Sequence, residues 1–249
     1  MIAQPLKQTA RRIFGGLYSS YDWVLDYFTL FQDRYWKRWL LARASLSSDD
    51  LILDIGCGTG VLEEKFAPDA NVVGIDLSDE MLEIARSKHL SGFNALILGD
   101  AERLPFSSGS FDKVLSCYAV KYCNLKKFVA QTFRVLKPGG RLVIYDFARP
   151  RGLLGPLHFF YIYGVFRLLG LLTKRYDTGM SITFSELPQI IARTHWFEEL
   201  GLALQNEGFE GCSNRFLSGG GVAIFWARKP CNGTELCLPN SRTPKNRSV

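Results

Sequence analysis

The sequence feature that most constrains the fold is an apolar run that ends in three alternating glycines. Residues 51–60 read Leu-Ile-Leu-Asp-Ile-Gly-Cys-Gly-Thr-Gly. Such a run is typical of a buried parallel strand that turns sharply into a helix. Because Gly56, Gly58 and Gly60 lack a Cβ, the backbone there can adopt positive φ and approach a small molecule closely, while the first amides of the helix face it. The sequence therefore predicts a ligand-binding turn at the end of this strand.

The spacing of the glycines separates two classes of ligand. A dinucleotide-binding turn has the pattern G-x-G-x-x-G, whereas this chain has G-x-G-x-G with Asp54 two residues before the first glycine. A carboxylate at this position disfavours a pyrophosphate but offsets the ammonium and sulfonium charges of S-adenosylmethionine (SAM). We therefore expect SAM as the cofactor; the alternative is a glycine-rich turn that binds no ligand.

Strand-like and helix-like segments alternate along the middle of the chain. The strand candidates are residues 51–55, 72–76, 95–98, 113–117 and 141–145, followed by a last pair at 210–217 and 221–227. Strands that alternate with helices predict an α/β fold, in which a mostly parallel sheet carries helices on both faces. The last two strands finish this sheet as an antiparallel pair. Ligands of such sheets bind at the carboxyl ends of the strands.

Two further carboxylates fall at predicted strand ends. Asp76 follows the second strand and can accept both hydroxyls of a ribose; the alternative is that it, or Ser78, only caps the next helix. Asp100 follows the third strand and can accept the exocyclic amine of adenine while the amide of Ala101 donates to a ring nitrogen. On its own, Asp100 would be an ordinary loop residue.

The N-terminal part is rich in aromatic residues. Between residues 11 and 44 the apolar positions recur at intervals of three and four, which favours two amphipathic helices. We expect residues 1–48 to form a helical cap, although these aromatics can equally serve only as packing. Residues 49–229 then form the main domain, and the polar segment 230–249 is expected to be disordered.

The charge distribution and the cysteine spacing argue against a nucleic-acid-binding protein and against a zinc protein. The formal net charge is +6 and the pI is about 9.0, but part of the excess positive charge lies in the C-terminal tail. The basic residues do not cluster on one face, as they would in a nucleic-acid-binding protein. The six cysteines show no zinc-ligand spacing, so we expect no metal and a cytoplasmic protein with reduced thiols.

Five ordered sequence blocks carry a resemblance to a known family. They are residues 53–60, 74–78, 99–106 (Gly-Asp-Ala-Glu-Arg-Leu-Pro-Phe), 110–112 and 136–140 (Leu-Lys-Pro-Gly-Gly). In this order they resemble the class I SAM-dependent methyltransferases, which implies a Rossmann-like fold with a seven-stranded sheet. The flanking residues Tyr21-Asp22, Trp36-Lys37-Arg38, 146–150 and 218–223 are similar to the ubiquinone/menaquinone biosynthesis C-methyltransferases. The expected cofactor-binding set is Tyr21, Asp54, Gly56, Cys57, Gly58, Gly60, Asp76, Leu77, Met81, Asp100, Ala101, Glu102 and Cys117.

The resemblance also implies an acceptor, a small and lipophilic prenylated quinol methylated on a ring carbon. Such a carbon needs a base or a positive group beside its hydroxyl, and the candidates are Tyr21, Lys121 and His158. The family's Arg-Asn pair after the fourth strand is replaced here by Ala119-Val120-Lys121-Tyr122-Cys123. Another small molecule or a phospholipid amine is therefore an alternative acceptor, and a SAM-binding protein without turnover is an alternative function. A nucleic-acid C5-methyltransferase with Cys117 as nucleophile lacks the expected Pro-Cys context.

An apolar segment at residues 153–172, within a helical insertion at about 151–196, is long enough to consider as a membrane span. Arg167 lies inside it, and a crossing would separate the last two strands from their sheet. We expect a helix or helix pair laid over the cleft, available to an isoprenoid tail or to a membrane surface as a peripheral contact. The alternative is an inserted core helix that touches no lipid.

Overall fold

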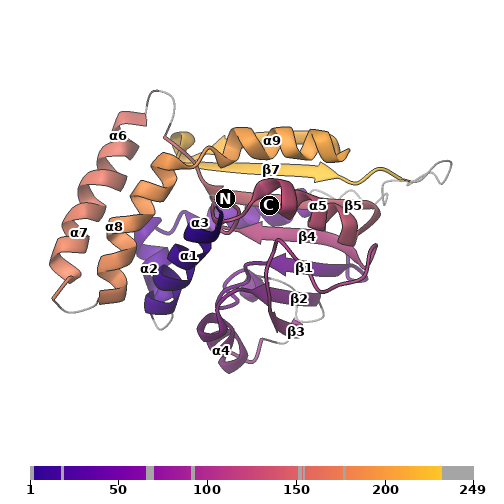
Figure 1. Ribbon diagram of the computed structural model, residues 1–249, viewed down its shortest axis with the longest axis horizontal. Helices are drawn as coiled ribbons and strands as arrows, with labels where there is room; N and C mark the ends of the chain where they lie inside the picture. Colours follow the sequence, from indigo (N-terminus) through magenta and orange to yellow (C-terminus); the bar gives the residue numbers. More distant parts are fainter. Residues whose placement is uncertain are drawn as a thin grey trace, which may run out of the picture.

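The computed structural model describes residues 3–17, 20–65, 70–90, 93–150, 153, 155–175 and 178–231 (Figure 1). A seven-stranded sheet with the order β3-β2-β1-β4-β5-β7-β6 lies at its centre. The strands are β1 (Leu51–Ile55), β2 (Asn71–Asp76), β3 (Phe93–Leu98), β4 (Phe111–Cys117), β5 (Leu136–Phe147), β6 (Glu210–Leu217) and β7 (Val222–Arg228). Strands β1 to β5 pair in parallel, whereas β7 is antiparallel to both β5 and β6. The predicted fold class is confirmed.

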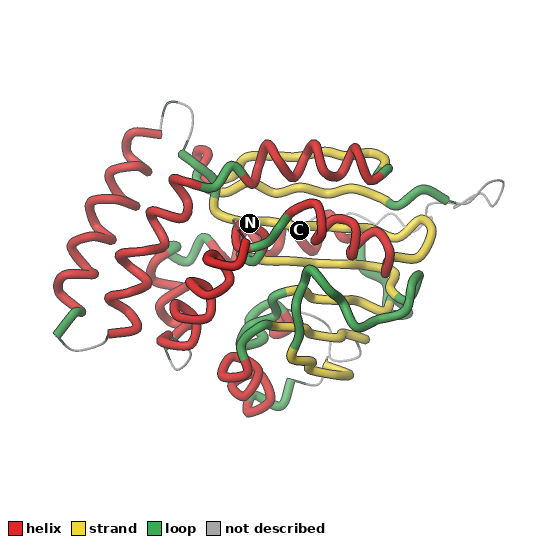
Figure 2. The backbone as a smooth tube through the Cα atoms, viewed as in Figure 1, coloured by secondary structure: helices red, strands yellow, loops and turns green. Residues whose placement is uncertain are grey.

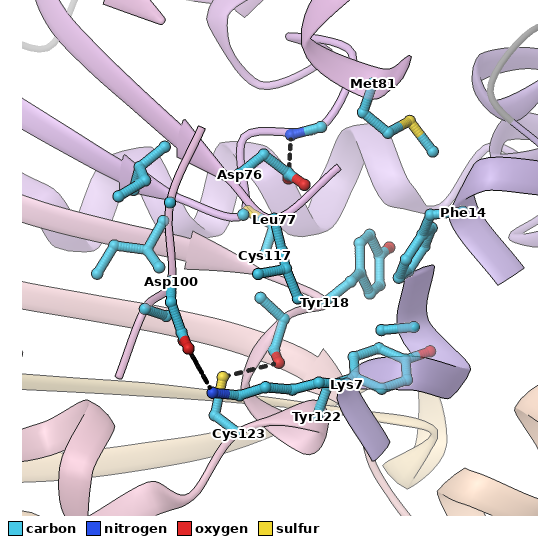
Figure 3. Close-up of a pocket in the computed structure, with 18 of the residues that line it drawn as sticks. Lys7, Phe14, Asp76, Leu77, Met81, Asp100, Cys117, Tyr118, Tyr122 and Cys123 are labelled. Carbon is cyan, nitrogen blue, oxygen red and sulfur yellow. Dashed lines mark hydrogen bonds and ion pairs between the residues drawn. The ribbon is translucent and has the colours of Figure 1, made fainter. Parts of the chain in front are cut away.

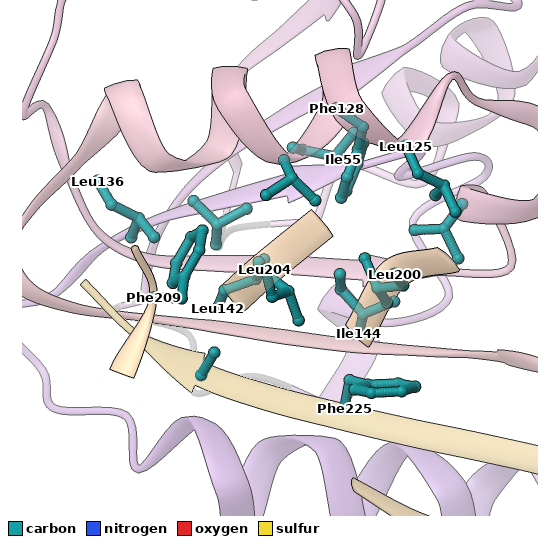
Figure 4. Packing of buried hydrophobic residues seen from close by; sticks show 14 of the residues in the cluster. Ile55, Leu125, Phe128, Leu136, Leu142, Ile144, Leu200, Leu204, Phe209 and Phe225 are labelled. Carbon is teal, nitrogen blue, oxygen red and sulfur yellow. The ribbon is translucent and has the colours of Figure 1, made fainter. Parts of the chain in front are cut away.

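Side chains alternate along each strand, so its apolar residues contribute to two cores, one on each face of the sheet. On one face, Leu53 and Ile55 of β1 pack under α5 (Leu125–Val135) and α9 (Trp196–Glu207) (Figure 4). On the other face, Ile52 packs against α3 (Asp33–Ala44). Because neighbouring residues of a strand point to opposite faces, a strand buried on both sides reads as the continuous apolar run seen in the sequence.

The remaining helices gather at one end of the sheet. They are α1 (Ala3–Leu17), α2 (Tyr21–Phe28), α6 (Gly155–Phe160), α7 (Phe166–Thr173) and α8 (Thr178–Arg193), with a π-helical turn η3 (Tyr161–Val165) between α6 and α7. The arrows of β1 and β4 point toward this helical layer in Figure 1, and Figure 2 shows the same helices in red at that end of the yellow strands. The helices therefore cover the carboxyl ends of the parallel strands, where ligands of α/β sheets bind. The smaller elements are α4 (Asp79–Ser87) and the 3-10 turns η1 (Glu63–Lys65), η2 (Val120–Tyr122) and η4 (Ser218–Gly220).

The aromatic segment 11–44 contains the end of α1 and the whole of α2 and α3, so the expectation of two helices was wrong. The helices α2 and α3 separate where Leu30 and Phe31 adopt positive φ of 49° and 60°, a conformation that ends a right-handed helix. The guanidinium of Arg34 lies 5.3 Å above the ring of Phe31 and helps to hold this turn.

None of the helices in the described ranges is both long and apolar enough to cross a membrane. The helical run α6–η3–α7 covers most of the apolar segment 153–172. Cys57, Cys117, Cys123 and Cys212 are free thiols, whereas Cys231, beyond the last strand, is disulfide-bonded. The expectation of reduced thiols therefore fails at Cys231. Most of the tail expected to be disordered, residues 232–249, lies outside the described residues.

Candidate functional site

The glycine turn adopts the backbone conformation that its sequence predicts. Gly56, Gly58 and Gly60 have φ of 76°, 56° and 80°, values that favour glycine. A Cβ on Gly56 would lie 2.7 Å from the Cβ of Ala119, and one on Gly60 would lie 2.7 Å from Leu90. A Cβ on Gly58 would meet nothing within 4 Å. Gly58 therefore faces open space, while the other two glycines permit close packing.

A cavity of about 100 Å³ opens beside this turn (Figure 3). Nine residues of the expected cofactor set line it: Tyr21, Gly56, Gly58, Asp76, Leu77, Met81, Asp100, Ala101 and Cys117. The wall also contains Lys7, Ala10 and Phe14 of α1, and Tyr118, Ala119, Tyr122 and Cys123 after β4. Asp54, Cys57, Gly60 and Glu102 are not among the lining residues. The structure thus brings the carboxyl ends of β1, β2 and β4 together with a helix from the N-terminus.

Asp76 ends β2 and is held by backbone amides. Its two oxygens accept hydrogen bonds from the amides of Gly58 (2.8 Å) and Ser78 (2.9 Å). Ser78 itself caps α4, because its hydroxyl accepts from the amide of Met81 at 3.3 Å. Burial raises the pKa of Asp76, and the backbone hydrogen bonds oppose that shift. The carboxylate is therefore fixed in the cavity wall without being needed as a helix cap.

Asp100 and Glu102 meet a lysine from the other end of the sequence. The ammonium of Lys7 lies 2.7 Å from Asp100 and 2.8 Å from Glu102 (Figure 3). Burial alone would raise the pKa of Asp100, but the hydrogen bonds from Lys7 and from the amide of Glu102 lower it below its ordinary value. Glu102 also accepts from the amide of Asn124 at 2.8 Å. These ion pairs of Lys7 thus hold α1 across the cavity.

Asp54 lies behind the turn and is buried next to Glu63 of η1. Burial raises the pKa of Asp54 to about 6, and burial together with Asp54 raises that of Glu63 well above its ordinary value. Two carboxyls so placed titrate as a coupled pair. Cys57 is buried as well, and its sulfur would lie 2.8 Å from a Cβ on Gly74. Both side chains support the turn from outside the cavity.

A second, smaller cavity of about 60 Å³ adjoins the first. The two share Phe14, Tyr21, Tyr118 and Tyr122, and the rest of the second wall is apolar except for Lys121 and Thr183. It is lined by Ile13, Phe14, Tyr21, Val24, Leu25, Phe28, Tyr118, Lys121, Tyr122, Phe147, Phe166, Thr183, Phe184 and Leu187. Four aromatic rings therefore separate a chamber that carries the carboxylates of Asp76 and Asp100 from one that carries none.

Lys121 is buried, with its ammonium 2.7 Å from Asp146 and 4.6 Å from the ring centroid of Tyr122. Burial lowers the pKa of Lys121, and Asp146 opposes that shift. Tyr21, the second catalytic candidate, has its pKa raised well above the ordinary value by burial and then by Asp33 and Asp22, so it is a neutral phenol at physiological pH. The third candidate, His158, belongs to α6, and its side chain lies outside the described residues.

The residues that sequence reasoning missed are Lys7, Phe14, Tyr118 and Tyr122. Lys7 and Phe14 reach the site only through tertiary packing, because α1 lies against α8 and no local pattern marks it. Tyr118 could have been predicted as a site residue, since it directly follows β4 at the edge of the sheet where ligands bind. It adopts a φ of 61°, a conformation that is uncommon for an aromatic residue and concentrates at functional sites.

The comparisons with known proteins agree with this geometry. Residues 53–144 match the methyltransferase domain family. The demethylmenaquinone methyltransferase of Tropheryma whipplei is 33% identical over 229 residues, which are 89% of this chain and 92% of that protein. The ubiquinone/menaquinone biosynthesis C-methyltransferase UbiE of Psychromonas ingrahamii is 32% identical over 222 residues, 85% of this chain and 87% of that protein.

A solved structure has the same fold. Phosphoethanolamine N-methyltransferase 2 of Haemonchus contortus in complex with SAM gives a TM-score of 0.57 at 17% identity, over 79% of this chain and 52% of that one. The two curated relatives match along most of their length. The chain is a SAM-dependent methyltransferase and belongs to the ubiquinone/menaquinone biosynthesis C-methyltransferase family.

Proposed function

We propose that this enzyme transfers the methyl group of SAM to a ring carbon of a prenylated quinol. The observation that carries the proposal is the pair of adjoining cavities. One is edged by glycines and carries two carboxylates, the other is apolar with a buried ammonium in its wall, and the two share aromatic wall residues. The names of the relatives from Tropheryma whipplei and Psychromonas ingrahamii, which refer to menaquinone and ubiquinone, support this acceptor class.

The residues of the first cavity fit SAM. Asp76 is a fixed carboxylate suited to the two ribose hydroxyls, and Asp100 with the amide of Ala101 is suited to the adenine edge. Gly58 leaves room for close approach of the ligand. Bound SAM supplies a methyl group on a sulfonium, and the aromatic wall of Tyr21, Tyr118 and Phe14 excludes water from the place of transfer.

In the second cavity, Lys121 is placed to stabilise charge on the acceptor. A quinol that has lost its hydroxyl proton to solvent is nucleophilic at the neighbouring ring carbon, and its oxygen carries negative charge. After the methyl group is transferred, that carbon releases its own proton to solvent and the ring becomes aromatic again. An ammonium fixed in an apolar chamber stabilises such an oxygen strongly, because no water competes. Lys121 replaces the missing arginine as the cation, and the neutral phenol of Tyr21 can donate a hydrogen bond to the same oxygen.

We also propose that the enzyme receives its acceptor at a membrane surface. Leu30, Phe31, Leu157 and Phe160 are large apolar side chains that are about half or more exposed. An apolar surface of this kind suits a peripheral contact with lipid. Sedimentation with liposomes tests it: we expect Leu157→Asp with Phe31→Asp to reduce the bound fraction, and equal binding of wild type and variant would contradict the contact.

The acceptor class is tested with SAM carrying a labelled methyl group. We expect label to enter a reduced, prenylated naphthoquinol that lacks its ring methyl, and mass spectrometry to place it on a carbon. Phosphatidylethanolamine serves as the competing acceptor. Transfer to the amine and not to the quinol would make the enzyme a phospholipid methyltransferase. SAM binding without transfer to either would contradict the quinol proposal.

A further inference from the structure

A third cavity adjoins the second and is larger than either of the first two. Its volume is about 290 Å³. It shares Phe28, Phe147, Phe166 and Leu187 with the second cavity. The rings of Phe28 and Phe166 lie 4.5 Å apart at this junction, and those of Phe28 and Phe184 also 4.5 Å apart. The three cavities therefore lie in series from the glycine turn, with packed aromatic rings between the second and the third.

The hydroxyl and indole groups that line the third cavity are bonded within the protein. The indole of Trp36 donates to the hydroxyl of Ser218 at 2.8 Å, and that hydroxyl donates to the side chain of Gln32 at 2.5 Å. The hydroxyls of Thr29 and Tyr161 donate to backbone carbonyls, each at 2.8 Å. These groups need no partner from a ligand or from water. The chamber thus presents an apolar interior, which favours an apolar occupant over water.

The chamber has an open mouth. Leu30 and Leu157 line it and are 61% and 65% exposed, although leucine side chains of an isolated cavity would be buried. Ile191 of α8 and Val222 of β7, both buried, form part of its inner wall. A chain that passes the aromatic junction by displacing its packed rings can therefore leave between Leu30 and Leu157.

We infer that the third cavity binds the first isoprene units of the acceptor's tail, while the acceptor's hydroxyl points toward Lys121 in the second cavity. Because the second cavity of about 60 Å³ is smaller than a site for benzene, the ring enters it by displacing the aromatic side chains that line it. This inference rests on the proposed function. A cavity of ~150 Å³ is enough to hold benzene, so a chamber of about 290 Å³ accommodates roughly two isoprene units. The remainder of a longer tail passes Leu30 and Leu157 toward lipid. The chamber thereby distinguishes prenylated quinols from water-soluble ones.

Acceptors with zero, one, two and four isoprene units test the inference. For the wild-type enzyme, we expect kcat/KM to rise to about two units and then to level, because additional units lie outside the chamber. The variants Ile191→Phe, which fills the chamber, and Leu157→Trp, which narrows its mouth, should lower the ratio of kcat/KM for the two-unit and zero-unit acceptors by roughly tenfold. Leu202→Trp on α9 is the matched control, since Leu202 is 62% exposed and lies outside the chamber lining, and its ratio should equal that of the wild type.

Direct binding of geraniol separates the inference from the proposed function. Geraniol contains two isoprene units and no quinol ring, so calorimetry reports the chamber alone. We expect saturable binding to wild type and to Leu202→Trp, and roughly tenfold weaker binding to Leu157→Trp and Ile191→Phe. Leu157 is exposed, so its variant should fold normally even if Ile191→Phe does not.

Three outcomes decide the matter. Geraniol binding that the chamber variants weaken supports the chamber even if no quinol is methylated, and then only the acceptor assignment fails. Quinol methylation with no dependence on tail length, together with no geraniol binding, overturns the chamber and leaves the proposed function standing. Geraniol binding that Leu157→Trp leaves unchanged also overturns the chamber, because the ligand then lies elsewhere.

Discussion

The carboxylate of Asp33 on α3 accepts a hydrogen bond of 2.7 Å from the hydroxyl of Tyr118, which lies 85 residues further along the chain. The same oxygen accepts from Tyr145 at 2.7 Å, and the other oxygen pairs with Lys37 at 2.5 Å. All four side chains are buried. Tyr118 also stacks on Phe147, with ring centroids 4.8 Å apart. A single carboxylate on the helical cap thus fixes the aromatic ring that separates the first two cavities.

This arrangement offers a matched pair of variants. Tyr118→Phe and Tyr145→Phe each remove one hydrogen bond of equal length to the same oxygen, so each should lower the free energy of unfolding by about 1–2 kcal/mol. Only Tyr118 lines the cavities. We therefore expect Tyr118→Phe to lower kcat/KM for the acceptor roughly fivefold to tenfold, because a ring that contacts the acceptor would be slightly misplaced. Tyr145→Phe should change kcat/KM less than twofold.

Chemical denaturation and steady-state kinetics on both variants measure these effects. Equal kinetic losses would mean that the network acts only through global stability. Wild-type kinetics in Tyr118→Phe would mean that stacking on Phe147 alone positions the ring.

The sheet and the glycine turn were predictable from sequence because their signals are local. A continuous apolar strand, alternating glycines and carboxylates at strand ends each follow from a few neighbouring residues. The contact of Lys7 with Asp100 spans 93 residues, and nothing in the first ten residues marks it. Asp54 was expected at the cofactor, but the structure places it against Glu63, whose burial could not be read from a charged sequence such as Glu63-Glu64-Lys65.

Replacement of Lys121 tests its role as the cation of the acceptor cavity. Lys121→Met leaves Asp146 buried without its ion pair, which should cost about 3–5 kcal/mol of stability. The double variant Lys121→Met/Asp146→Asn removes both charges and should recover part of this loss. If the ammonium stabilises charge on the acceptor, both variants should show kcat reduced roughly 100-fold with SAM affinity close to wild type.

The pH profile provides an independent check on Lys121. Burial lowers the pKa of Lys121 below 10.5. The alkaline side of the pH–activity profile should therefore begin to fall below pH 10.5, as the ammonium loses its proton. A double variant that regains activity together with stability would assign Lys121 a purely structural role.

Asp76→Ala should weaken SAM binding by about 2–4 kcal/mol, because a charge-assisted pair of hydrogen bonds to the ribose is lost. Ser78→Ala is the control: it removes the cap of α4 and should cost about 1 kcal/mol of stability with little effect on SAM affinity. Calorimetry measures both affinities. Wild-type affinity in Asp76→Ala would remove this carboxylate from the cofactor site.

Lys7→Met tests whether α1 retains the cofactor. The ion pairs to Asp100 and Glu102 hold this helix across the first cavity. Because such partly exposed pairs contribute up to about 1 kcal/mol, we expect SAM to dissociate roughly fivefold faster from the variant. Gln8→Met, at an exposed and uncharged position of α1, is the control. Stopped-flow measurements that give the same dissociation rate for wild type and Lys7→Met would show that α1 does not limit release.

The carboxyl pair Asp54 and Glu63 makes stability depend on pH. Both groups have folded-state pKa values raised above their ordinary values of 3.8 and 4.5. Between those ordinary values and the raised ones, the folded protein holds more protons than the unfolded chain, so the free energy of unfolding falls as pH rises. The stabilisation is complete below about pH 4 and is lost as pH rises through the folded pKa of Asp54, about 6, and then through that of Glu63.

Glu63→Gln keeps a hydrogen-bond donor toward Asp54 but cannot release a proton. Its free energy of unfolding should therefore fall less steeply with pH than that of the wild type, by up to about 1.4 kcal/mol per pH unit where Glu63 titrates. Glu64→Gln is the neighbouring control, since Glu64 is exposed and pairs with Lys88 and should retain the wild-type slope. Urea denaturation at pH 5, 6, 7 and 8 gives the three slopes. If the slopes of Glu63→Gln and wild type coincide, Glu63 exchanges no proton in this range, and the turn that carries Gly56 and Gly58 is supported by Asp54 without a shared proton.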